Sequence, residues 1–178
     1  MGTAGVSDWM MLKAFVLVEH VIGWMINSSD RSKFAGHQFF IIRDKDPDLR
    51  TVGAAAQKGQ RNTGSAKYTV INEALVCREA VDTIRPHDPA EYRGFDTPVH
   101  EFGHSIEAIL GLAARSDRVY KMNIRDYDRK LSREYFSFSV QRRFGSAGRA
   151  AKSIPGYEQT YLSTIFSSDE TWLPTCEK

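Results

Sequence analysis

Residues 97–110, TPVHEFGHSIEAIL, contain two histidines four positions apart, His100 and His104, and Glu101 directly follows the first. On a helix, positions i and i+4 lie one turn apart on the same face, so both imidazoles can bind one tetrahedral metal ion. A glutamate at i+1 lies beside these ligands and can accept a proton from a water molecule that zinc has made more acidic. The pattern therefore predicts one catalytic Zn²⁺ and hydrolysis of a polypeptide, with Glu101 as the general base.

The residues around the motif predict a helix from 98 to 110. Thr97 can cap its N-terminus, Pro98 suits its first turn, and Gly111 suits its end. On a helical wheel the apolar residues form one stripe, and the two histidines fall on a separate polar face together with Glu107. The apolar stripe consists of Val99, Phe102, Ile106, Ile109 and Leu110. The motif also arises by chance in unrelated proteins, so an ordinary helix with two surface histidines is the alternative.

A catalytic zinc ion needs a third protein ligand and an open coordination position. The metzincin pattern would place Gly at 107 and His at 110, but this chain has Glu107 and Leu110, so that class is excluded. Glu107 lies on the next turn of the same helix, where it is better placed to orient a histidine than to bind the metal. Glu134, in SREYFSF, is the better third ligand, because a second helix can return and present its carboxylate.

HEFGH, followed after two residues by an acid and later by the SREYFSF segment, resembles the catalytic domain of anthrax lethal factor and its relatives. Those proteins are gluzincin-type zinc endopeptidases. The resemblance covers residues 97–138 and implies that His100, His104 and Glu134 bind zinc and that Glu101 is the base. It also implies that Tyr127, seven residues before Glu134, donates a hydrogen bond to the developing oxyanion.

Two features of this chain depart from that family. The connection between the two motifs is shorter, and Phe138 stands where the family has a second acid, one turn after the glutamate ligand. The first departure indicates a trimmed connection between two helices. The second leaves the role of that acid without a counterpart.

Other segments must position this site. Residues 7–26 predict a helix capped by Ser7 or Asp8, and three polar residues within it favour burial over a membrane span: Lys13, Glu19 and His20. Residues 37–44 and 67–77 predict strands, 53–65 a loop, and 132–144 a helix that Ser132 caps and Gly145 ends. The last thirty residues predict helical segments and coil. If the zinc-peptidase interpretation holds, strand 67–77 is the edge strand to which an extended substrate adds.

The length of 178 residues predicts a single domain, 1–178, of the α+β class. We expect a zincin-like architecture with a small mixed sheet, an active-site helix and a second ligand-bearing helix. The net charge of +2 gives no reason to expect a nucleic-acid partner, and a monomer is the default. Cys77 and Cys176 can form a disulfide, and Asn27 begins a glycosylation sequon, which together favour a secreted protein over a cytoplasmic one.

Two other functions remain open. In the first, the chain is a binding module that zinc only stabilises, and Cys176 could then close the fourth coordination position. In the second, the chain is a hydrolase related to peptide deformylase, with Cys77 as a thiolate ligand. VGAAAQ, residues 52–57, faintly resembles that family's glutamine motif, but the glycine-flanked cysteine is missing from EALVCRE.

Overall fold

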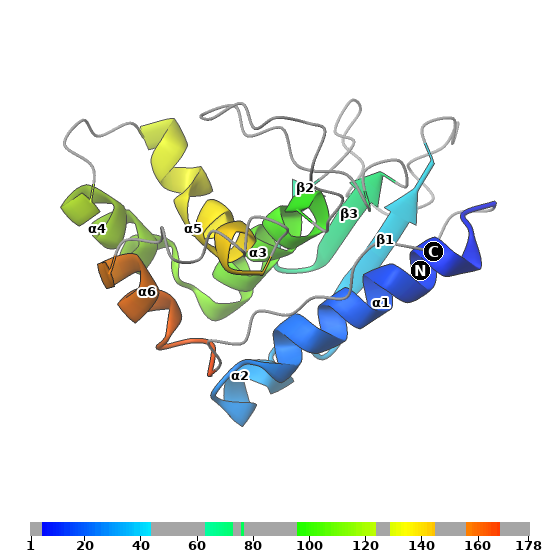
Figure 1. Cartoon of the computed structure of the whole chain (residues 1–178), viewed down its shortest axis with the longest axis horizontal. Helices are drawn as coiled ribbons and strands as arrows, with labels where there is room; N and C mark the ends of the chain where they lie inside the picture. The colour runs from blue at the N-terminus through cyan, green and yellow to red at the C-terminus, as the bar shows by residue number, and fades with distance from the viewer. Residues whose placement is uncertain are drawn as a thin grey trace.

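The computed structural model describes residues 5–43, 63–72, 76, 96–123, 129–144 and 156–167. Over these residues the chain forms six helices and one three-stranded mixed sheet, which confirms the predicted α+β class (Figure 1). Cys77 and Cys176 lie outside the described residues. The predicted disulfide therefore stays a prediction.

The sheet has the strand order β1-β3-β2. β1 (Gln38–Ile42) runs parallel to β3 (Tyr68–Asn72), and β2 (Thr63–Gly64) pairs with β3 in the antiparallel sense. The prediction that strand 67–77 forms the edge was wrong, because β3 lies between the other two strands. β2 is the edge strand on that side, and it comes from the end of a segment predicted to be a loop.

Burial along the two longer strands follows from their positions. Val70 and Ile71 of β3 and Ile41 and Ile42 of β1 are buried, as expected for strands covered on both faces. Thr69 is also fully buried, and its hydroxyl forms hydrogen bonds to side chains of other elements. A buried hydroxyl requires such partners, because leaving it without a hydrogen bond is energetically unfavourable.

The predicted N-terminal helix is α1 (Asp8–Gly23). Its cap is Ser7, whose Oγ accepts a hydrogen bond from the backbone N–H of Met10 at 3.3 Å. Ala14, Leu17 and Val21 are buried and lie at i, i+3 and i+7, the spacing of one helix face. Within the described ranges, no helix combines the length and apolarity that crossing a membrane requires. A short helix, α2 (Ser28–Ser32), connects α1 to β1.

The helix that carries the histidine motif is α3 (Asp96–Leu110). It begins two residues earlier than predicted, so Thr97 lies buried in the first turn instead of capping it. The predicted end is confirmed: Gly111 has φ of +67°, and the N–H of Leu112 donates to the carbonyl of Glu107 at 2.9 Å. This is the Schellman arrangement, in which glycine adopts a left-handed conformation at no steric cost. The chain continues directly into α4 (Ala113–Asn123).

The predicted helix at 132–144 is α5 (Arg129–Phe144), and a further helix, α6 (Gly156–Leu162), follows. Phe136, Val140 and Phe144 are fully buried at i, i+4 and i+8, which explains why helical spacing overrode the local alternation of Phe and Ser. Ser132 does not cap α5, because the helix starts three residues before it. α3 contacts β2 and β3 on one side and α5 on the other, so the motif helix lies at the centre of the fold (Figure 1).

Candidate metal centre

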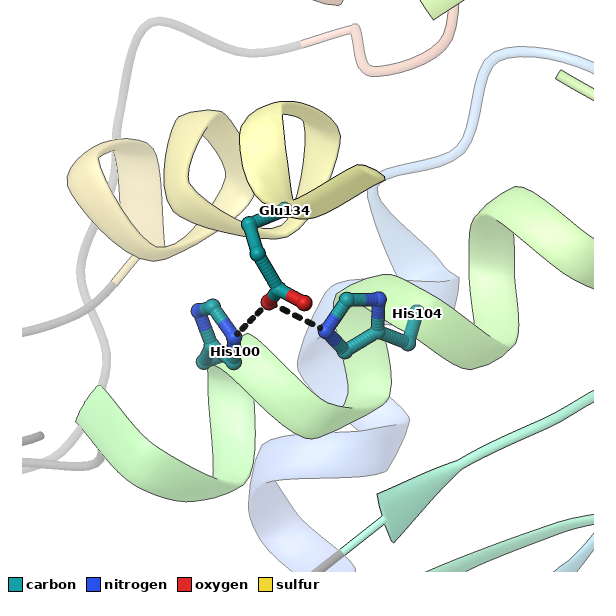
Figure 2. Close-up of side chains that lie close together, drawn as sticks. All are labelled: His100, His104 and Glu134. Atoms are coloured by element: carbon teal, nitrogen blue, oxygen red, sulfur yellow. Dashed lines mark hydrogen bonds and ion pairs between the residues drawn. The ribbon is translucent and has the colours of Figure 1, made fainter. Parts of the chain in front are cut away.

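The site forms where α3 and α5 pack closely together. At Gly103, within the motif, an added Cβ would lie 2.9 Å from the Cα of Ser137 on α5. Real Cβ atoms essentially never come that close to a backbone atom, so this crossing requires glycine. Glu134 lies one helical turn before Ser137, and the close crossing brings its side chain over the two histidines of α3 (Figure 2).

One carboxylate oxygen of Glu134 contacts both histidines. Its Oε2 lies 3.2 Å from Nε2 of His100 and 3.0 Å from Nε2 of His104 (Figure 2). Their ligand atoms all lie within 4.8 Å of one another. Zinc bonds of about 2.0–2.1 Å in a tetrahedron place ligand atoms about 3.3 Å apart. The two nitrogen–oxygen distances therefore match the spacing of zinc ligands, and all three atoms are of types that zinc binds.

The charges of these three residues are coupled. The hydrogen bonds from His100 and His104 hold the pKa of the Glu134 carboxyl far below its usual range. Burial of His104 opposes its protonation, but the hydrogen bond and charge of Glu134, together with the charges of Glu101 and Glu107, outweigh burial and raise the pKa of this histidine. Without a metal, the carboxylate and the imidazolium thus stabilise each other. A divalent cation can replace the hydrogens that the histidines donate to Glu134, because the ligand atoms of all three residues lie close together.

Glu101 lies beside the ligands, partly buried on α3. Burial raises the pKa of its carboxyl, and the nearby charges of His100 and His104 only partly oppose this shift. A carboxylate with a raised pKa is a better proton acceptor at neutral pH. The neighbouring backbone is also tightly packed, since a Cβ on Gly64 of β2 would lie 1.9 Å from the carbonyl oxygen of Glu101. The edge strand is therefore in direct contact with the motif.

Glu107, predicted to orient a histidine, lies near His104 but hydrogen-bonds to Ser116 of α4. Burial raises the pKa of Glu107, and this hydrogen bond lowers it in part. The Ser116 Oγ lies 2.9 Å from the hydroxyl of Tyr161 on α6. Because Ser116 has one proton, donation to Glu107 requires that Tyr161 donate to Ser116. The charge of Glu107 contributes to the raised pKa of His104, so its action on the histidine is electrostatic.

Tyr127, predicted to stabilise the oxyanion, lies outside the described residues. Sequence reasoning missed two groups: one contacts a histidine of the site, and the other attaches the motif helix to the sheet. Gln141 of α5 places its Oε1 3.1 Å from Nδ1 of His100. It lies seven residues after Glu134, and this spacing, which puts both on one face of a helix, is the signal that could have identified it.

The second missed group attaches α3 to the sheet. The Oγ of Ser105, directly after His104, accepts a hydrogen bond from the backbone N–H of Ser65 at 3.1 Å and lies 2.7 Å from Thr69 Oγ1. Thr69 Oγ1 in turn lies 3.0 Å from Nε2 of His37. Ser105 is fully buried, and its hydroxyl faces the sheet. A small polar residue next to the edge of the predicted apolar stripe was its only sequence signal.

Searches against models of known protein families, curated proteins and solved structures found no match for this chain.

Proposed function

We propose that this chain is a zinc-dependent endopeptidase of the gluzincin type with a zincin-like fold, related in its catalytic residues to the lethal factor family. The observation that carries the proposal is the convergence of His100, His104 and Glu134 from two helices, with their ligand atoms all within 4.8 Å of one another. Two histidines and one carboxylate are the ligand set of several zinc peptidases. Three protein ligands leave a coordination position for water, which is the arrangement of a catalytic site.

Zinc bound by these residues would supply a Lewis acid and lower the pKa of a water molecule to about 7. The chain's own residues do the rest. Glu101 accepts a proton and passes it to the leaving amine, a function consistent with its raised pKa. Glu134 and the histidines fix the reaction centre relative to Glu101. Tyr127 remains the proposed hydrogen-bond donor to the oxyanion.

The experiment has two stages. In the first, the zinc content of the purified chain is measured by mass spectrometry together with that of Glu134→Ala. We expect about one zinc per chain, lost or much weakened in the variant. Glu19→Ala is the matched control, because Glu19 is an exposed glutamate on another helix and should leave zinc content unchanged.

In the second stage, cleavage of a mixed peptide library is followed by mass spectrometry for the wild type and for Glu101→Gln. The variant should keep its zinc and lose turnover by about 10²-fold to 10⁴-fold, the contribution typical of a general base. A chain that binds zinc but cleaves no peptide, and in which Glu101→Gln changes nothing, is a zinc-stabilised binding module. A chain that binds no zinc even after incubation with the metal refutes the proposal entirely.

A further inference from the structure

The ring of His100 is held on both sides by α5. Its Nδ1 lies 3.1 Å from Oε1 of Gln141, and its Nε2 faces Glu134. Phe138, between these two residues on the same helix face, has its ring centroid 4.7 Å from that of the imidazole at an interplanar angle of 58°. The Gln141 side chain is almost completely buried, so water competes little for this hydrogen bond.

The chemistry of the amide decides where a proton lies on His100. An amide oxygen can only accept a hydrogen bond, so Nδ1 must carry a hydrogen and donate it. In the metal-free structure Nε2 donates its own hydrogen to Glu134 (Figure 2). When a metal ion displaces that hydrogen, the one held on Nδ1 remains, and the lone pair of Nε2 points toward Glu134. A metal ligand needs this tautomer and this ring orientation.

We propose that Gln141 is a positioning residue of the metal centre: by accepting the Nδ1–H of His100, it fixes the tautomer and ring orientation in which Nε2 binds the metal. This inference rests on the zinc site of the proposed function. It goes beyond the function because it explains how the ring of the first ligand is held in place. Phe138 limits rotation of the ring by packing, and Gln141 selects the nitrogen.

The group that accepts the hydrogen bond of His100 Nδ1, the amide of Gln141, carries no charge. A carboxylate at the same position would accept the same hydrogen bond and would also add negative charge beside His100. That charge favours a bound cation, so a glutamate at this position should preserve zinc affinity or increase it. Leucine has a similar volume but no acceptor atom, so leucine at this position should weaken zinc binding. Comparing the two substitutions therefore distinguishes the effect of the hydrogen bond on zinc affinity from the effect of packing.

The experiment measures zinc affinity by competition with a chromophoric chelator for the wild type, Gln141→Leu and Gln141→Glu. We expect Gln141→Leu to bind zinc about 10-fold to 100-fold more weakly, the usual effect of losing a partner that orients a metal-bound histidine. Gln141→Glu should bind at least as tightly as the wild type. Gln159→Leu makes the same chemical change at an exposed position on α6 and should have no effect.

A second measurement does not depend on any variant at position 141. Long-range ¹H–¹⁵N spectra of the zinc-loaded wild type should show the proton of His100 on Nδ1 and the metal on Nε2. His100 is assigned from the signals that disappear in His100→Asn. A protonated Nε2, or a metal bound through Nδ1, overturns the inference even if Gln141→Leu fails to fold.

The outcomes separate this inference from the proposed function. Weakened zinc binding in Gln141→Leu in a chain that cleaves no peptide supports the positioning role and refutes the peptidase. Unchanged zinc affinity in Gln141→Leu in an active peptidase refutes the positioning role alone. Equal weakening in Gln141→Leu and Gln141→Glu also refutes it, because then packing and not the hydrogen bond matters. A wild-type chain that binds no zinc overturns both.

Discussion

Gly103→Ala tests whether the close crossing of α3 and α5 sets the geometry of the proposed metal centre. The added Cβ would lie 2.9 Å from Ser137 Cα and 3.3 Å from both Cβ and Oγ of that serine. Because ordinary contacts between carbon atoms are about 3.5–4.0 Å, the helices must separate by about 0.6–1.1 Å at this point. The backbone of Ser137 cannot rotate away as a flexible side chain could.

Two opposing effects determine the stability of this variant. Replacing glycine by alanine within a helix stabilises it by about 0.5–1 kcal/mol. Overpacking at a buried contact destabilises by about 1–3 kcal/mol, so we expect a net loss of about 1 kcal/mol. For a chain of this length that loss lowers the Tm by about 2–4 °C.

The effect on zinc should be larger than the effect on stability. Metal–ligand distances tolerate about 0.2 Å, and the expected separation of the helices moves Glu134 away from both histidines by more than that. We expect zinc affinity to fall by about 10-fold to 100-fold, as measured by chelator competition together with a calorimetric Tm.

The matched control is Gly23→Ala at the exposed end of α1, where an added Cβ has no atom within 4 Å. This variant should gain slightly in Tm and bind zinc like the wild type. If Gly103→Ala behaves in the same way, the close contact does not govern the site and the reasoning is refuted.

The network that attaches α3 to the sheet gives two further expectations. Ser105→Ala removes one hydrogen-bond partner from the N–H of Ser65 and one from the hydroxyl of Thr69, which should destabilise the folded state by about 1–3 kcal/mol. Calorimetry should therefore show a lower Tm. Ser163→Ala, at an exposed position, should leave the Tm unchanged. Burial lowers the pKa of His37 below its ordinary value of 6.5. The unfolded chain therefore binds a proton on His37 more readily than the folded chain does. As a result, the folded state loses stability as pH falls from 6.5 toward the pKa of His37 in the folded chain. His37→Gln lacks that proton-binding step, so the free energy of unfolding of the wild type minus that of the variant should decrease from pH 7.5 to pH 5 in urea titrations. A difference that stays constant with pH would contradict the effect attributed to burial.

The structure also shows which parts of the site depend on local sequence. The spacing of His100 and His104 gives two imidazoles on one face of any helix, whatever surrounds it, since the periodicity belongs to the helix itself. The left-handed turn at Gly111 is equally local. The prediction of a second helix around Glu134 was confirmed for the same reason. Phe136, Val140 and Phe144 have the i, i+4 and i+8 spacing of one helix face, and that face is buried.

The starts of α3 and α5 were less well predicted than their ends. Thr97 and Ser132 are good capping residues by type, yet both lie inside their helices. Ser132 instead forms its hydrogen bond with Asp117 of α4. A side chain with several available partners takes the one that packing brings near, and packing is not visible in the local sequence.

The sequence by itself therefore determined the motif helix, the separation of its polar and apolar faces, the position of Glu101 beside the two histidines and the class of the fold. Only the tertiary structure decided that β3 lies inside the sheet, that Gln141 meets His100, and that Gly103 lets α5 approach closely enough for Glu134 to reach both histidines. The physical reason is distance along the chain. Spacing within a helix is fixed by its hydrogen bonds, whereas contacts between residues thirty or more positions apart depend on how all the elements pack together.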